Sequence, residues 1–401
     1  MSGKPMPDAP PLKLFDEIER TETRPKSYRE PIYSYYNSSS RRPIAAVREI
    51  LQQWFDSFPA EGKRDLLGRL KSPIDSQHRA AFWEVYLHEL FSGLGYTLEP
   101  HPTIPDSQKH PDYLVKSGTT PQFYLEAVVA GLPSSVEVGA DARLAEVLDL
   151  INKMETPEYF LEHRGTPNSA PPVRELRDAL EKWLGSLDMN AVDALCKAGK
   201  FEALPTYKWS RDGLRLTFRP VPKSAQASPD ARQIGINMGG AGFITPDQDI
   251  RDSIESKAKK YGTLPLPLVV AVNVISDHCD EIDINNALFG SESFVVFQEP
   301  DGSLHEGPAR RLPNGIWFGK DGPRNQLVSA VFIVTNLDPY ISGIETPLLI
   351  HNPFAKNPLQ LSGYLLPQSV PDSATKTMKR LGGKSAAEFL RLPKPWPPAH
   401  D

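Results

Sequence analysis

Three carboxylates stand inside otherwise apolar segments between Phe82 and Ala130. Glu84 lies in a segment with helical spacing, Asp112 opens a short apolar stretch directly after a proline, and Glu126 lies in the middle of another. An unpaired buried carboxylate is costly, so three of them in one short region indicate a shared site. A hard divalent cation with oxygen ligands is the simplest partner that would hold the three together.

The elements that carry these acids are predicted from the spacing of apolar residues. A helix is expected over 77–94, with one apolar stripe and a stop at Gly95. Strands are expected over 96–99, 112–116 and 123–129, in one mixed sheet with that helix against one face and a second helix, 140–154, packed near it. Within the third strand, alternation places Glu126 on the same face as Val128.

A later segment, 268–275, is apolar at every position except Asn273. Such a run suits a strand buried on both faces, as in the centre of a parallel or mixed sheet. We therefore expect this strand to rejoin the sheet that carries the acids. The expected helix 249–261 ends just before it and carries Lys257 and Lys260 on one face.

Composition excludes several classes of protein. The chain has 401 residues, 39% of them hydrophobic and 24% charged, which is typical of a globular protein larger than one minimal core. A net charge of −5 means that any nucleic-acid surface must be a local patch. Two cysteines, Cys196 and Cys279, provide no disulfide or metal framework. Because no segment reads as a signal peptide or membrane helix, we expect a cytoplasmic protein without a membrane partner.

The order of these patterns predicts five segments. They are an N-terminal arm with a helical preface (1–75, with helices at 43–57 and 61–71), a core (76–156), an insertion (157–248), the rest of the core with the C-terminal strands (249–365), and a tail (366–401). The tail is rich in Pro and Lys, and we expect it to wrap the surface or to be mobile.

Three further patterns indicate chemistry only weakly. A tract of tyrosines followed by Arg41 and Arg42 could stack on nucleic acid, but an arm lying on the protein's own surface is the simpler interpretation. The glycine-rich residues 238–242 lack the lysine of a phosphate-binding loop, so we interpret them as a turn. His278 and Asp280 lack the spacing of a zinc site, which favours a solvated loop.

The ordered set of elements and acids resembles the PD-(D/E)xK nuclease superfamily. Pro111-Asp112 matches the PD, Glu126-Ala127-Val128 matches the (D/E)xK, and the spacing of the two motifs suits neighbouring strands joined by a hairpin. Glu84 stands ahead of Gly95 as the first-helix acid does in Mrr-like enzymes. The resemblance implies an α/β (mixed α+β) fold with a restriction-endonuclease-like core. That core has a mixed central sheet flanked by helices, here with a large insertion and a C-terminal extension.

The same resemblance implies a metal-dependent DNA endonuclease of restriction or phage-defence type. Asp112 and Glu126 would bind Mg²⁺ (or Mn²⁺) directly, and Glu84 would act through water or hold a second ion. The metal polarises the phosphoryl oxygen and lowers the pKa of a bound water. DNA is then the expected partner, and a homodimer is left open.

One position departs from the family pattern, because Val128 stands where the family has its catalytic lysine. A replacement must come from another element, and we favour Lys257 and Lys260 over Lys116, since the face of their helix could overlie the carboxylates. The departure also supports an alternative, a catalytically inactive nuclease-fold module that binds nucleic acid or a protein. A third hypothesis is a protein that is not a nuclease and whose acids are structural.

Overall fold

The computed structural model describes residues 12–105, 107–132, 135–154, 159–165, 172–211, 214–223, 236–238, 245–276, 278–293, 296–298, 304–307, 310–361 and 363–399. Its internal contacts divide the chain into two compact units. Unit 1 comprises residues 36–132 and 245–401 together with the segment before Thr23, and unit 2 comprises residues 23–35 and 133–244. The inserted part of the chain thus begins at 133, earlier than the expected 157.

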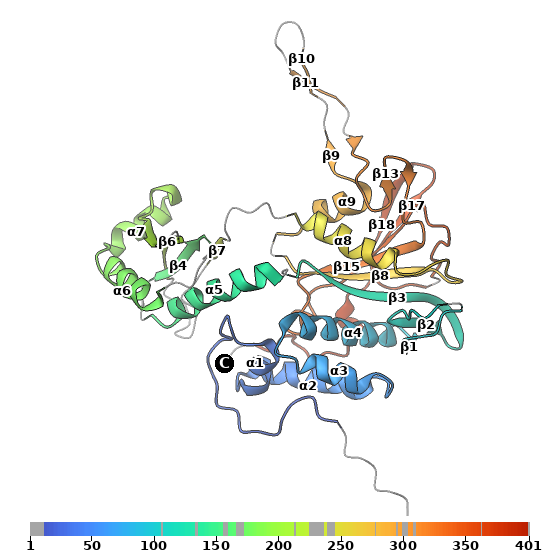
Figure 1. The fold of residues 1–401 in the computed structure, drawn as a ribbon, viewed down its shortest axis with the longest axis horizontal. Helices are drawn as coiled ribbons and strands as arrows, with labels where there is room; N and C mark the ends of the chain where they lie inside the picture. Colours follow the sequence, from blue (N-terminus) through green and yellow to red (C-terminus); the bar gives the residue numbers. More distant parts are fainter. Residues whose placement is uncertain are drawn as a thin grey trace, which may run out of the picture. The chain divides into compact units, whose positions relative to one another are not determined.

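An eight-stranded mixed sheet forms the centre of unit 1 (Figure 1). The first three strands form an antiparallel meander, and β8 lies parallel to both β3 and β15. Both the predicted meander and the predicted return of the apolar segment to its sheet are therefore confirmed. The strand order is β1 (Thr97–Pro100), β2 (Tyr113–Ser117), β3 (Thr120–Ala130), β8 (Leu268–Val274), β15 (Val328–Thr335), β16 (Leu348–His351), β17 (Gln368–Asp372) and β18 (Thr377–Leu381).

Helix α4 (Asp75–Gly93) packs on one face of this sheet through large aromatic side chains. The rings of Trp83 and Phe91 both contact Phe332 of β15. The indole N–H of Trp83 donates to the carbonyl oxygen of Ala271 in β8 at 3.1 Å, so the helix is also tied to the sheet backbone. Helices α2 (Arg42–Ser57) and α3 (Lys63–Leu70) are the two helices expected in the helical preface, and both pack against α4.

The opposite face of the sheet is covered by α8 (Pro246–Ala258) and α9 (Glu281–Phe289) (Figure 1). Apolar residues of α8 recur at helical spacing, and Ile250, Ile254 and Ala258 pack in one core with Val270 and Val272 of β8. Burial of this stripe fixes which way the remaining side chains of α8 point. That orientation is what makes the polar face of α8 relevant to the site.

The prediction for helix 140–154 was wrong in its packing. The helix exists, as α5 (Ser135–Asn152), but its residues Val147, Leu148 and Ile151 pack in the core of unit 2 with Tyr159 and Leu161. An apolar stripe specifies that a helix is buried and leaves open which surface buries it. The second helix on the central sheet is α8, from much later in the chain.

Unit 2 contains a four-stranded sheet backed by helices. Its strand order is β5 (Tyr207–Arg211), β6 (Leu214–Pro222), β4 (Tyr159–Arg164) and β7 (Ile236–Met238). Its described helices are α5, α6 (Val173–Leu184), α7 (Met189–Lys197) and the short η1 (Phe201–Ala203). The predicted glycine-rich turn at 238–242 lies almost entirely outside the described residues.

The described residues of the tail and of the tyrosine tract form regular secondary structure. The segment expected to wrap the surface or to be mobile supplies β17 and β18 to the central sheet, followed by η2 (Ala386–Glu388). At the other end, α1 (Ile32–Ser38) carries Tyr35 and Tyr36, which are buried and so are core residues rather than a stacking surface. Among the described residues, no helix has both the length and the apolar character needed to cross a membrane.

Short strands complete the described part of unit 1 and contribute little to the site. They pair as β12 with β9, β10 with β11, and β13 with β14. Their bounds are β9 (Glu292–Ser293), β10 (Val296–Gln298), β11 (Leu304–Glu306), β12 (Arg310–Arg311), β13 (Phe318–Gly319) and β14 (Gly322–Pro323).

Candidate active site

Asp112 and Glu126, the two predicted metal ligands, lie side by side where β2 begins. In the antiparallel pair of β2 and β3, Tyr113 lies opposite Leu125, so one further step of this register sets Asp112 opposite Glu126. The backbone N–H of Ala127 donates to Oδ2 of Asp112 at 2.6 Å, which fixes that carboxyl beside β3. The hairpin therefore brings together two of the predicted site residues.

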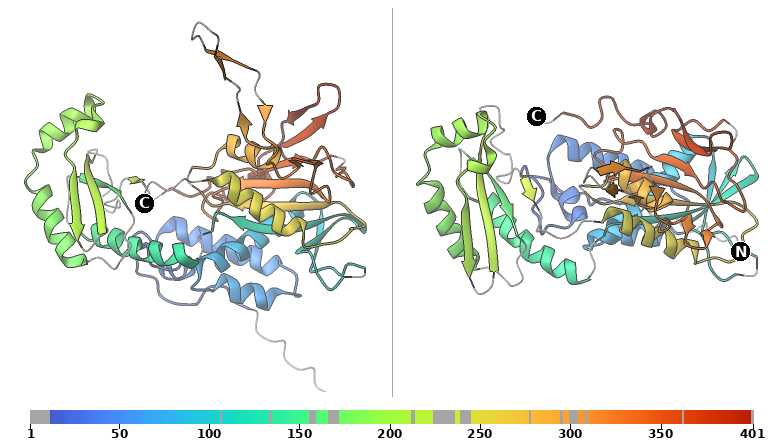
Figure 2. Two further views of the ribbon diagram at one scale, coloured as in Figure 1. Left: turned by 45° about the horizontal axis from the view of Figure 1, so that its top comes forward. Right: turned by 90° about the horizontal axis from the view of Figure 1, so that it is seen from above.

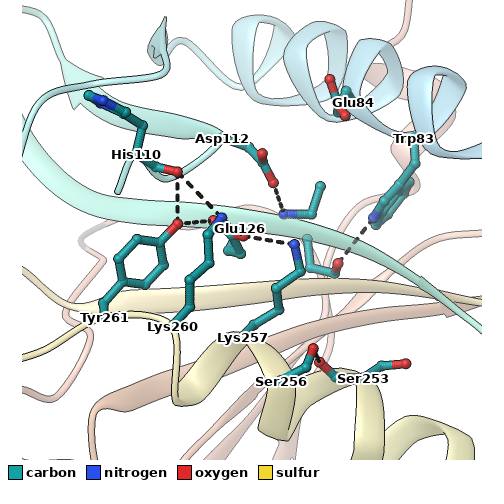
Figure 3. A network of polar contacts seen from close by, with 12 residues as sticks. Trp83, Glu84, His110, Asp112, Glu126, Ser253, Ser256, Lys257, Lys260 and Tyr261 are labelled. Carbon is teal, nitrogen blue, oxygen red and sulfur yellow. Dashed lines mark hydrogen bonds and ion pairs between the residues drawn. The ribbon is translucent and has the colours of Figure 1, made fainter. Parts of the chain in front are cut away.

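Glu126 is fully buried, with 0% of its surface exposed, and both of its carboxylate oxygens receive hydrogen bonds (Figure 3). The Lys257 ammonium donates to Oε1 at 2.8 Å and the Lys260 ammonium to the same oxygen at 2.7 Å. The Tyr261 hydroxyl lies 2.6 Å from Oε2. The predicted lysines thus reach the predicted acid directly, and a tyrosine that we did not predict joins them.

Helix α8 presents Lys257 to Glu126, and the turn that follows α8 presents Lys260, because the other side of the helix is anchored in the core. Residues three apart lie on the same side of a helix, so Lys257 and Lys260 project together. Ile254 and Ala258, both buried, hold the adjacent side of the helix against the sheet. Tyr261 lies just beyond this turn and is buried in the same core, which places its hydroxyl at the carboxylate.

The charges around Glu126 keep it ionised. Burial alone would raise the pKa of Glu126, but the Coulomb attraction of Lys257 and the hydrogen bonds from Lys257, Lys260 and Tyr261 outweigh burial and lower that pKa below its usual value. Burial and the hydrogen bond to Glu126 raise the pKa of Tyr261, so its hydroxyl stays protonated. The cluster is therefore a carboxylate held by two cations and one neutral donor.

A backbone carbonyl connects this cluster to the Pro111-Asp112 segment. The carbonyl oxygen of His110 lies 2.8 Å from the Tyr261 hydroxyl oxygen and 3.4 Å from the Lys260 ammonium. The hydroxyl has one proton, so at any moment it donates either to His110 or to Glu126. Tyr261 and Lys260 thus hold the entry of β2 and the carboxylate of β3 in a fixed relation.

Asp112 differs from Glu126 in its protonation. Burial, followed by the charges of Glu126 and Glu84, raises the pKa of Asp112 to about 7. Lys257 opposes the shift, as does the hydrogen bond from Ala127. Near neutral pH, Asp112 therefore carries a proton in part of the molecules, and a cation placed beside it would remove that proton.

This raised pKa predicts how stability depends on pH. The carboxyl binds its proton more tightly in the folded chain than at its ordinary pKa of 3.8, so the free energy of unfolding falls as pH rises from about 4 to about 7. Asp112→Asn keeps an oxygen for Ala127 and removes the titration, so it should lose less stability between pH 5 and pH 8. Urea unfolding at both pH values, with EDTA present, measures this. Parallel losses in the two proteins would contradict the prediction.

Glu84 makes a separate ion pair. Its two oxygens accept from the guanidinium of Arg69 in α3 at 2.6 and 2.7 Å. The hydrogen bond to Glu84 raises the pKa of Arg69, and Glu84 in turn helps to raise the pKa of Asp112. Glu84 therefore acts on Asp112 through its field, and no hydrogen bond described in the structure links it to Glu126. Its predicted role at a metal stays a prediction.

The remaining candidates lie away from Glu126. The Lys116 ammonium pairs with Glu99 across β1 and β2, which gives it another partner in the sheet. Asp280 is the N-cap of α9 and forms a capping box with Asp283, which explains the acid-rich sequence around His278 as helix capping.

Two residues of the site escaped prediction from the sequence. Tyr261 is the last residue of the expected lysine helix, but an aromatic residue just before a strand is usually part of the core, and only the fold shows that its hydroxyl reaches Glu126. Arg69 lies in a short helix that also contains Arg64, and nothing in the sequence distinguishes the arginine that reaches the site from the one that does not. Its spacing from Asp65 is typical of an exposed helical pair, and that pair is also present.

The donor set can be tested against the metal that the resemblance implies. Among the described residues, no group of three or more His, Cys, Asp or Glu side chains is placed to hold a metal ion. Mg²⁺ commonly binds through only one or two carboxylates, with water and substrate phosphate as its other ligands. Asp112 and Glu126 fit that smaller set. Burial is the main cause of the raised pKa of Asp112, but the negative charges of Glu126 and Glu84 add to it, and a cation at this place would offset them.

Comparison with known proteins adds no assignment. No protein-family model, curated protein or solved structure matches the chain.

Proposed function

We propose that this protein is a metal-dependent DNA endonuclease of the restriction-endonuclease-like type. One observation supports the proposal above all others: the ammonium groups of Lys257 in α8 and of Lys260 in the turn after it contact the buried carboxylate of Glu126, opposite Asp112. The order of the elements also agrees with a nuclease core, since a helix, an antiparallel meander, a second helix and a parallel strand follow one another in unit 1.

Asp112 and Glu126 are the residues that would hold Mg²⁺ in this proposal. When bound, the ion would polarise the phosphodiester and make a bound water more acidic. Ala127 orients Asp112 through its N–H, and Tyr261 orients Glu126 through its hydroxyl. Because Asp112 titrates near pH 7, its availability as a ligand increases as pH rises through that value.

The two lysines receive different roles. Lys257 acts electrostatically on both acids, since it opposes the rise in the pKa of Asp112 and helps to lower that of Glu126. Lys260 bonds Glu126 and the carbonyl of His110, which suits a positioning residue. We therefore assign to Lys257 the stabilisation of negative charge on the phosphoryl group. It would replace the lysine that the family has at the position of Val128.

Plasmid cleavage and metal binding test the proposal together. The wild-type protein should cut supercoiled plasmid with Mg²⁺ or Mn²⁺ and stop when EDTA is added. In calorimetric titration, Mn²⁺ should bind the wild type, and binding should be lost in an Asp112→Asn/Glu126→Gln double variant. Equal Mn²⁺ binding by both proteins would show that these carboxylates are not the metal ligands.

A second candidate function is supported by the same contacts. Glu126 already has two cationic donors and a hydroxyl, so the carboxylate is satisfied without a metal. A nuclease-fold module that binds nucleic acid without cutting it would need no more than this. Failure of the wild type to cut with any divalent metal, together with retained DNA binding, would favour the second candidate.

A further inference from the structure

The sheet of unit 2 has one face covered by helices. Side chains alternate between faces along a strand. Leu161 of β4 and both Leu216 and Phe218 of β6 point to the helical side, where they pack with Leu176 and Leu180 of α6. Figure 2 shows α6 and α7, in yellow-green, along one side of the strands of this sheet. The alternate residues of β4, β5 and β6 belong to the other face.

Basic side chains line up across that other face. In the register of the three strands, Lys208 lies opposite Thr217, and Thr217 lies opposite Arg164, so these residues form one row. In the next row Ser210 lies opposite Arg215. Lys208, Ser210 and Arg215 are exposed, and 47% of the Arg164 side-chain surface is exposed.

Two more cations extend this surface. Arg219 lies two residues beyond Thr217 on the same side of β6, opposite Glu162. The Lys223 ammonium lies 5.3 Å from the ring centroid of Phe160, which shares the face with Glu162. We name as the basic face the set of Lys208, Arg215, Arg164, Arg219 and Lys223 with the hydroxyl residues Ser210 and Thr217.

The charge balance of the basic face suits a polyanion. Glu162 is the one acid among its described strand residues, and Arg164 and Arg219 bond it at 3.0 and 2.9 Å. The whole chain carries a net charge of −5, so this excess of positive charge is local. Arginine, lysine, serine and threonine are the side chains that contact phosphate oxygens in protein–DNA complexes.

We propose that the basic face binds the phosphate backbone of duplex DNA. The choice of duplex DNA rests on the endonuclease function proposed above, whereas the preference for a polyanion follows from the charges of the face itself. Contacts to phosphates position a duplex without reading its sequence. Unit 2 then serves as a holding surface for the substrate.

The experiment measures DNA binding by the full chain without cleavage. Fluorescence anisotropy with a labelled duplex, in EDTA and at several salt concentrations, compares the wild type with Lys208→Ala/Arg215→Ala. A matched control, Lys182→Ala/Lys200→Ala, removes two exposed cations from the α6 and α7 segments of the same unit. Each lost phosphate contact lowers the salt slope by about 0.9, so two lost contacts should weaken binding by roughly 60-fold at 0.1 M salt.

The outcomes separate this proposal from the endonuclease proposal. A weakened affinity with a smaller salt slope in the Lys208→Ala/Arg215→Ala variant alone supports the basic face, even if the wild type never cuts. Equal affinity in the wild type and both variants overturns it, even if cleavage is observed. Vesicles with anionic lipid form a second arm of the test. Loss of vesicle binding with unchanged DNA binding would assign the face to a membrane and also overturn the proposal.

Discussion

Cleavage of supercoiled plasmid by Lys257→Ala is expected to be about 10²–10³ slower than by the wild type, the scale of losing one transition-state donor. Lys257 approaches Glu126 at 2.8 Å and acts electrostatically on Asp112, so its ammonium lies where the two acids meet. The loss should fall on turnover rather than on DNA affinity, because one lysine among many phosphate contacts adds little to binding. Single-turnover rates at saturating enzyme measure the first quantity, and anisotropy measures the second.

Lys259 provides the matched control for this experiment. It lies between the two site lysines in sequence, its side chain is 70% exposed, and it pairs with Glu255. Lys259→Ala should therefore cut at the wild-type rate. If cutting survives at that rate in Lys257→Ala, in Lys260→Ala and in Lys116→Ala, then another group supplies the positive charge and the assignment of Lys257 is wrong.

Removing both site lysines is expected to destabilise the fold by about 3–5 kcal/mol at pH 8, the usual cost of leaving a buried charge without its partner. Glu126 is 0% exposed, so its carboxylate cannot turn to water when Lys257→Met/Lys260→Met removes both ammonium groups. The buried carboxyl can escape this cost only by taking up a proton. Its pKa in the folded variant should therefore rise, and the variant should regain stability as pH falls towards 5.

Urea unfolding of this variant at pH 8 and pH 5 measures the effect, with Lys259→Met as the control. A substitution at an exposed site, away from the core and from buried ion pairs, typically changes the free energy of unfolding by less than about 0.5 kcal/mol. A double variant as stable as the control at pH 8 would show that the ion cluster is not needed to bury Glu126. Because the measurement needs no DNA and no metal, it applies to either proposed function.

The sequence predicted the elements of the site better than it predicted their partners. Alternation along β3 set Glu126 and Val128 on one face, and the apolar run of β8, in which Asn273 is the one polar residue, marked a central strand. Both signals are local, since they depend on side-chain period and on burial of a single segment. Lys257 and Lys260 were predicted from the same local signals, because the helix expected to carry them ends just before β8.

What the sequence did not reveal depends on contacts between distant segments. The apolar stripe of α5 could not indicate that its partners are Tyr159 and Leu161 rather than the central sheet. The ion pair of Glu84 with Arg69 joins two helices, and the sequence around either residue gives no signal that identifies its partner. The polar and proline-rich composition of the tail concealed β17 and β18, because β18 lies at the edge of the sheet and β17 beside it is only partly buried, so neither strand has a long apolar run.

The insertion of unit 2 between β3 and α8 divides the site along the chain. The acids precede the insertion and the lysines follow it, so Glu126 and Lys257 are separated by 131 residues in sequence. Contacts of such high sequence separation form late in folding, because a long loop must close before they give any stability. Until α8 docks, Glu126 has neither the Lys257 nor the Lys260 ammonium group beside it. During synthesis, the acid half of the cluster therefore exists well before its lysines have been translated.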